Sequence, residues 1–268
     1  MILRIPVLRR ILSVALLVAP SGIAPAANDA VEKPALTAET HRIRVVSGWT
    51  VRVDVRLLER NPEETRRALV LLERQLDEIA RVVPAEAVKR LREVTLWFSP
   101  AYPGVGPRAE YHPDRGWLAA HHRDPAMAKA VEFTNIPEFE AETRRMPNFA
   151  LHELAHAYHD RVLPGGFDNP ELKRAHARAV AGKTYDRVAR RDEVGRVHQD
   201  RAYALVNPME FFAENSEAFF SRNDFFPFDR SELAKADPDT ERLLARLWGV
   251  PNSAAPVPVS EKPRQAAP

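Results

Sequence analysis

Two histidines and a glutamate between Met146 and Leu163 are spaced for metal chemistry. His152, Glu153 and His156 form the pattern His-Glu-x-x-His. On an α-helix, residues four apart lie one turn apart on the same face, so the two imidazoles can bind one metal ion. Glu153 is offset by about 100° around the helix and flanks the metal. A carboxylate there can take a proton from metal-bound water, so the pattern predicts a catalytic zinc site.

The sequence around this pattern predicts the helix that the site requires. Pro164, Gly165 and Gly166 end the segment, and Pro147 suits a first turn. The residues that form an apolar stripe at helical spacing are Leu151, Leu154, Ala155, Tyr158 and Val162. Because the pattern is short, a buried helix with two hydrogen-bonded histidines is the alternative interpretation.

A third protein ligand is expected, because a catalytic zinc ion keeps only one position for water. A downstream helix that begins at Asn207 places Glu210 and Glu214 one turn apart on one face. Glu210 is the candidate ligand. Glu214 is expected to accept a hydrogen bond from the ring of a ligating histidine. A capping box formed by Asn207 and Glu210 is the alternative, but the neighbouring Phe211 and Phe212 predict burial, and a buried carboxylate needs a partner.

These segments resemble the gluzincin branch of zinc metallopeptidases, and most of all the family of the anthrax toxin lethal factor catalytic domain and its bacterial relatives. That family joins a His-Glu-x-x-His helix to a helix bearing Glu-Phe-Phe-Ala-Glu, here residues 210–214, with a tyrosine seven residues before it, here Tyr203. The resemblance covers residues 146–220. The ligands that it implies for a single Zn²⁺ are His152, His156 and Glu210. The catalytic residues that it implies are Glu153 as general base and Tyr203 as hydrogen-bond donor to the developing oxyanion or leaving group.

Three residues or segments near the site have open interpretations. Tyr203 can be a packing residue before a helix start. His159 is expected to support the ligands or to line the cleft. The segment from Val131 to Ile136 is predicted to be an edge strand that lines the cleft and pairs with extended substrate, the alternative being an ordinary strand of the sheet.

The N-terminal residues 1–26 have the pattern of a secretory signal peptide. Arg4, Arg9 and Arg10 precede an apolar run over residues 11–19, and small residues follow at 24–26. The run is short for a membrane span, so no stable membrane anchor is expected after cleavage, and a retained anchor is the alternative. The sequence predicts export to the periplasm or the extracellular space.

Composition excludes several classes of site and partner. Removal of the three leader arginines changes the formal net charge from +2 to about −1, so the charge gives no argument for nucleic-acid binding. The chain has no cysteine, which excludes disulfides and cysteine-bound zinc.

The chain is predicted to hold one catalytic domain over residues 41–249, after a flexible lead-in at 27–40 and before a disordered tail rich in proline and alanine at 250–268. Alternating apolar runs predict a hairpin at 43–55 and a strand at 94–98, and a strand is also expected at 117–121. The expected fold is α+β and zincin-like, with a small mixed sheet, a mostly helical C-terminal half and the active-site cleft between them.

The function predicted from these features is that of a secreted or periplasmic zinc-dependent endopeptidase that hydrolyses peptide or protein substrates. Two alternatives stay open. One is a secreted, zinc-stabilised binding protein without catalysis. The other is a zinc amidase that acts on a non-peptide or cell-wall amide.

Overall fold

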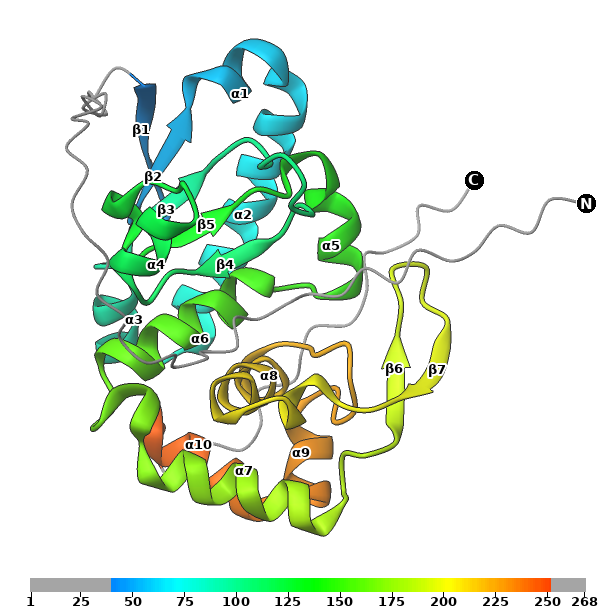
Figure 1. Cartoon of the computed structure of the whole chain (residues 1–268). Coiled ribbons are helices and arrows are strands. Elements are labelled where there is room, and N and C mark those ends of the chain that lie inside the picture. Colours follow the sequence, from blue (N-terminus) through cyan, green and yellow to red (C-terminus); the bar gives the residue numbers. More distant parts are fainter. Residues whose placement is uncertain (1–39, 252–268) are drawn as a thin grey trace, which may run out of the picture.

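A five-stranded sheet forms one half of the molecule and a group of helices forms the other (Figure 1). The computed structural model describes residues 40–251. The expected signal peptide, nearly all of the lead-in and nearly all of the tail lie outside the described residues. The strands are β1 His41–Val46, β2 Trp49–Asp54, β3 Leu96–Phe98, β4 Ala109–Tyr111, β5 Val131–Phe133, β6 Val188–Arg191 and β7 Val197–Asp200. The α-helices are α1 Val55–Arg60, α2 Pro62–Val82, α3 Ala85–Leu91, α4 Arg115–Ala120, α5 Phe139–Arg145, α6 Phe149–Arg161, α7 Pro170–Gly182, α8 Pro208–Phe220, α9 Arg230–Ala236 and α10 Pro238–Leu247. Short 3₁₀ helices are η2 Pro125–Met127, η3 Ile136–Glu138, η4 Gly166–Asp168 and η5 Tyr203–Leu205.

The sheet is mixed, with strand order β1-β2-β3-β5-β4. Strands β2, β3 and β5 are parallel, and β1 and β4 are antiparallel to their neighbours. The predicted N-terminal hairpin is confirmed. Its turn places Ser47 and Gly48 at positive φ, 48° and 91°, as a tight hairpin that matches the strand twist requires. Together, the mixed sheet and the helical half make this an α+β fold.

Two sequence predictions about the sheet are wrong. The strand at Val131 is internal, because β4 pairs with its outer side; the edge strand is therefore β4. The segment from Trp117 to His121 is not a strand, because residues 115–120 form helix α4. Asp114 begins that helix by accepting a hydrogen bond from the Trp117 N–H, an N-cap that outweighs the strand preference of the aromatic residue.

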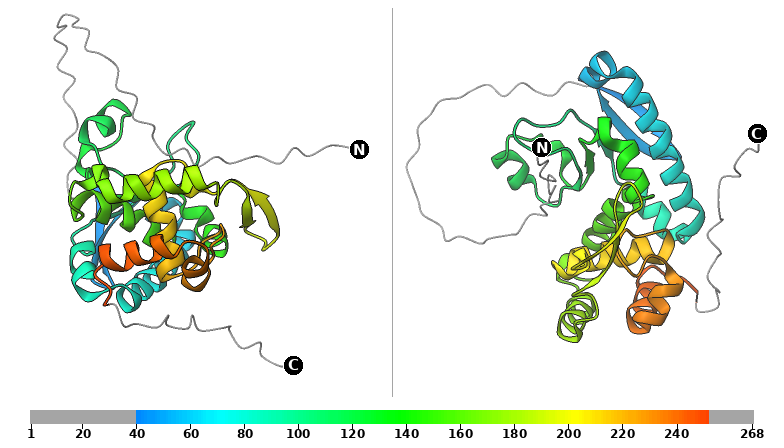
Figure 2. Two further views of the ribbon diagram at one scale, coloured as in Figure 1. Left: turned by 90° about the horizontal axis from the view of Figure 1, so that it is seen from below. Right: turned by 90° about the vertical axis from the view of Figure 1, so that its right-hand side faces the viewer.

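The sheet separates two apolar cores. Side chains alternate along β3, so Leu96 and Phe98 enter the large core while Trp97 enters a small one on the opposite face. Helices α2 and α6 cover the large-core face, as Figure 2 shows from two sides. Segments α4 and η2 supply Leu118 and Met127 to the small core. The two faces of the sheet therefore have separate surroundings.

Helix α8 is the centre of the helical half and packs along α6 (Figure 1). The Asn207 side chain caps α8 by accepting hydrogen bonds from the N–H groups of Met209 and Glu210. Trp248 closes the junction of the two helices: its ring stacks on Tyr158 of α6 at 4.1 Å between centroids, and its Nε1 donates to Ser216 of α8 at 3.0 Å. The β6–β7 hairpin extends from this half. Within residues 40–251, no helix combines the length and the apolar character that a membrane span requires.

Candidate metal centre

The packing of α6 against α8 brings the three predicted zinc ligands together. His152 and His156 lie one turn apart on α6, and Glu210 lies in the first turn of α8. The Oε2 atom of Glu210 is 3.1 Å from His152 Nε2 and 3.4 Å from His156 Nε2. All three residues are buried, and Glu210 is only 2% exposed. The three donor atoms therefore surround one point in the interior.

The donor set and its spacing fit a tetrahedral zinc ion. Ligand atoms about 2.0–2.1 Å from such an ion are separated from one another by roughly 3.3 Å. The two measured separations, 3.1 and 3.4 Å, lie on either side of that value. Two imidazole nitrogens and one carboxylate oxygen are also the donor types that catalytic zinc sites use, with the fourth position kept for water.

Glu153 belongs to α6, and its side chain reaches the edge strand β4. Its Oε2 accepts a hydrogen bond from the backbone N–H of Tyr111 in β4, at 2.8 Å. Burial raises the pKa of the Glu153 carboxyl above its ordinary value. A carboxylate with a raised pKa is a stronger base, which suits a group that takes up and releases a proton.

The carboxylate behind His152 is a different residue from the predicted one. Glu217 Oε1 lies 2.6 Å from His152 Nδ1, whereas Glu214 Oε1 lies 3.8 Å from the same atom. Glu214 instead accepts a hydrogen bond from Asn223 Nδ2 at 3.2 Å. Glu214 and Glu217 follow Glu210 by one and two turns on the same face of α8. Helix α6 crosses α8 in such a way that His152 Nδ1 contacts the more distant of the two, Glu217. The hydrogen bond from His152 Nδ1 to Glu217 Oε1 fixes the orientation of the ring.

Charge and burial act in opposite directions on the buried groups of the centre. Burial alone would lower the pKa of His152, but the hydrogen bonds to Glu210 and Glu217 hold it well above its ordinary value. Burial would raise the pKa of Glu210, but the nearby His156 and His152 hold it well below its ordinary value. Burial raises the pKa of Glu217 to about 7. The centre thus pairs an ionised Glu210 with nitrogens that attract positive charge, whether that charge is a proton or a metal ion.

Tyr203 and His159, the two other residues with predicted roles, differ in position. Tyr203 begins η5, which precedes and packs against α8, and its side chain is partly buried against the large core. His159 is fully buried, with its ring edge-on to Phe167 and Phe212 at about 5 Å. Within residues 40–251, His159 makes no hydrogen bond to a predicted ligand; the polar group near its ring is the backbone of Gly166. The ring is 0% exposed, so His159 does not line a cleft. Burial lowers its pKa to about 3.

Sequence reasoning missed the link between β4 and α6. Tyr111 uses its backbone to bind Glu153 and its hydroxyl to bind Asp160 Oδ2 at 2.7 Å. Lys129 Nζ also donates to Asp160 Oδ2, at 2.5 Å. Glu153 and Asp160 are two turns apart on α6, so one strand residue holds the helix at two points. Helical spacing indicates that the two acids share a face, but nothing in the sequence indicates which strand faces them.

A second group of histidine and glutamate side chains lies on the other face of the sheet. The ligand-type atoms of Glu110, His112 and Glu132 lie within 4.8 Å of one another, as do those of the first centre. The Arg123 guanidinium occupies this group, with Nη1 at 2.5 Å from Glu110 and 3.3 Å from Glu132. The second group is therefore a neutralised ion-pair network.

Comparisons with known proteins gave no relative: no protein-family model, curated protein or solved structure matches this chain. The chemistry of the centre consequently rests on its own geometry. That geometry offers two imidazole nitrogens and one carboxylate oxygen around one buried point, with the Glu153 carboxylate close enough to interact electrostatically with all three.

Proposed function

We propose that this protein is a zinc-dependent endopeptidase with a zincin-like arrangement of its α+β fold, exported by its leader. The observation that carries the proposal is the convergence of His152, His156 and Glu210 on one buried point, with Glu153 beside it. Zinc bound by these three residues would supply Lewis acidity and lower the pKa of its water toward about 7.

Glu153 is proposed to move the proton in this reaction. Tyr111 holds Oε2 of the carboxylate through a backbone hydrogen bond, which fixes the orientation of the group. Oε1 then accepts the proton of the attacking water and later passes it to the departing amine. Tyr203 is proposed to donate a hydrogen bond to the oxygen that develops negative charge.

The edge strand supports a peptide as the substrate. β4 is antiparallel to β5, and within residues 40–251 no strand pairs with its outer side. Its residue Tyr111 directs its N–H away from β5 and toward Glu153. An extended peptide that adds to this edge would pass directly over the basic carboxylate, as β-strand addition permits.

The first test is the zinc content of purified residues 27–268 without added metal, measured by elemental analysis. About one zinc ion per chain is expected. The second test compares peptide-library digestion by the wild type and Glu153→Gln. The substitution should abolish cleavage while zinc stays bound, because Glu153 is not a ligand.

Two outcomes would overturn the proposal. A folded chain that refuses zinc on titration would make the two histidines ordinary buried residues. Zinc binding without cleavage of any peptide would indicate a binding protein, or an amidase if the wild type but not Glu153→Gln cleaves peptidoglycan fragments.

A further inference from the structure

Tyr111 joins the edge strand β4 to helix α6 through two hydrogen bonds. Its backbone N–H donates to Glu153 Oε2 at 2.8 Å, and its hydroxyl donates to Asp160 Oδ2 at 2.7 Å. Glu153 and Asp160 are seven residues apart on α6, which places them on one face and about 10 Å apart along the helix axis. The side chain of Tyr111 therefore runs along the helix and fixes β4 against two different turns of α6.

The surroundings of the Tyr111 hydroxyl keep it a hydrogen-bond donor to a charged acceptor. Burial and Asp160 both raise the pKa of Tyr111, so the phenol stays protonated. Lys129 Nζ donates to the same Asp160 Oδ2 at 2.5 Å, and the Lys129 backbone N–H donates to the carbonyl oxygen of His112, the residue after β4, at 2.7 Å. Phe167 contacts the Tyr111 ring edge-on, at 6.4 Å between centroids. Asp160 is thus the point at which β4, α6 and the segment before β5 are joined.

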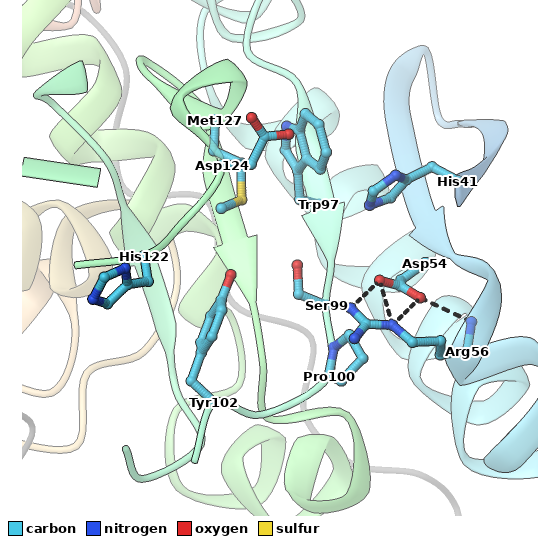
Figure 3. A pocket seen from close by; sticks show the side chains of 10 residues that line it. All are labelled: His41, Asp54, Arg56, Trp97, Ser99, Pro100, Tyr102, His122, Asp124 and Met127. Atoms are coloured by element: carbon cyan, nitrogen blue, oxygen red, sulfur yellow. Dashed lines mark hydrogen bonds and ion pairs between the residues drawn. The ribbon is translucent and has the colours of Figure 1, made fainter. Parts of the chain in front are cut away.

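The other face of β4 is attached to the sheet and not to the helix. On that face the Glu110 side chain is paired with Arg123. A cavity of about 170 Å³ lies on the same face of the sheet (Figure 3), where dashed lines mark the bonds between Asp54 and Arg56. No residue of β4 and no predicted metal ligand lines this cavity. These contacts fix β4 within the sheet, so the distance from β4 to Glu153 depends on the contacts that β4 makes with α6.

We propose that Asp160 is a positioning residue for Glu153. By holding the Tyr111 hydroxyl, Asp160 keeps β4 at the distance at which the Tyr111 N–H bonds Glu153 Oε2. Glu153 then keeps one orientation, with Oε1 left to accept a proton. A general base must lie within hydrogen-bond reach of the proton that it takes, so a displaced carboxylate slows the reaction. This catalytic consequence rests on the proposed endopeptidase function, whereas the positioning of the carboxylate does not.

Amide hydrogen exchange, followed by NMR on the purified chain, measures the bond between the residue 111 N–H and Glu153. Tyr111→Phe removes the hydroxyl and keeps the ring, Asp160→Ala removes the acceptor, and Asp160→Asn retains an oxygen that can accept. Glu153→Gln gives the exchange rate of this amide when its partner has lost its charge. The matched control is Tyr185→Phe, because the hydroxyl of the buried Tyr185 also donates to an aspartate, Asp237 Oδ2, at 3.3 Å.

The residue 111 amide should exchange about tenfold faster in Tyr111→Phe and Asp160→Ala, the cost of one hydrogen bond. Its rate should stay near that of the wild type in Asp160→Asn and Tyr185→Phe. With a peptide substrate, Tyr111→Phe and Asp160→Ala should lower kcat by at least about tenfold, with KM and zinc content changed little. A loss of stability alone would not separate kcat from KM in this way.

Two results would overturn the positioning role. One is an unchanged exchange rate at residue 111 in both Tyr111→Phe and Asp160→Ala. The other is acceleration spread over the amides of the whole chain, which would mean general destabilisation. Faster exchange at residue 111 with an unchanged kcat would overturn the catalytic consequence alone. If the wild type cleaves no peptide, the endopeptidase proposal fails, and the exchange rates still decide whether Asp160 positions Glu153.

Discussion

The group formed by His152, His156 and Glu210 and the group formed by Glu110, His112 and Glu132 contain the same residue types, but their negative charges are balanced in different ways. The first, His152, His156 and Glu210, has no lysine or arginine within it. The second, Glu110, His112 and Glu132, is filled by Arg123, which also stacks on Tyr102 and Trp117 at 4.7 and 5.2 Å. A metal-ligand spacing alone therefore does not distinguish a metal site from a structural network.

What differs is the source of the compensating positive charge. In the second group the chain provides a fixed guanidinium, so the carboxylates are satisfied without any outside ion. In the first group only the histidine rings can carry positive charge, and a metal ion can replace their protons. The absence of a built-in cation is what favours metal binding at the first group.

The largest expected effect comes from removing the carboxylate of the first group. Glu210→Gln should lower zinc affinity by more than about 100-fold, because removal of a residue that only orients a ligand already costs up to about that much. The substitution should also abolish the proposed peptidase activity. Glu132→Gln is the matched change in the second group and should leave zinc content unchanged. Both are measured by competition with a chromogenic chelator. Tight zinc binding by Glu210→Gln would remove Glu210 from the ligand set.

Removal of the fixed cation should break the second group. Arg123→Met removes the guanidinium that bridges Glu110 and the buried Glu132, although Arg108 stays near Glu110 and Tyr102 and His112 stay on Glu132. It should lower the free energy of unfolding by about 1.5–3 kcal/mol, the usual loss of a hydrogen bond to a charged group, measured by urea denaturation. Lys89→Met, which removes an exposed ion pair with Glu86, should change it little. An Arg123→Met protein as stable as the wild type would show that the network contributes nothing to stability.

Glu217 and Glu214 allow a finer test of the first group. Glu217→Ala removes the hydrogen bond to His152 Nδ1 and should weaken zinc binding by about 10–100-fold. Glu214→Ala deletes the same number of atoms one turn away and should cost less, because Glu214 lies 3.8 Å from that nitrogen. A larger loss for Glu214→Ala would reassign the orienting carboxylate.

The smallest effect concerns acid stability in the second group. The folded-state pKa of Glu132 is below its unfolded value of 4.5, so its contribution to stability is present above that pH and is lost as the pH falls through the folded pKa. One proton changes the free energy by at most about 1.4 kcal/mol per pH unit. Wild type should therefore lose stability more steeply below pH 4.5 than Glu132→Gln, in urea titrations at several pH values. Parallel slopes would mean that Glu132 does not titrate differently in the two states.

Local spacing explains which parts of the site the sequence predicted. His152 and His156 lie on one face because they are four residues apart on a helix. Asn207 correctly indicated where α8 begins. The choice of Glu217 over Glu214 could not be predicted, because it depends on where two helices cross. For the same reason the edge position of β4 was missed: strand order follows from long-range pairing, which the alternation of apolar residues does not encode.

In the fold as well, features set by neighbouring residues were predicted, and features that depend on more distant residues were not. The hairpin turn at Ser47 and the helix that begins at Pro62 are set by neighbouring residues and were predicted. Even there, Asn61 begins the helix without making a side-chain cap hydrogen bond. Helix α4 was predicted as a strand because the β preference of Trp117 and the apolar residues after it was overestimated, and the cap at Asp114 was not recognised.

The position of Trp248 has a consequence for the order in which the chain matures. This side chain joins α6 to α8 through Tyr158 and Ser216, yet it follows both ligand-bearing helices in the sequence. A ribosome therefore releases all three ligands before the residue that fastens them together. The packing of Trp248 across α6 and α8 forms only once synthesis has passed residue 248, so we expect the proposed zinc site to become fixed, and to acquire metal, late.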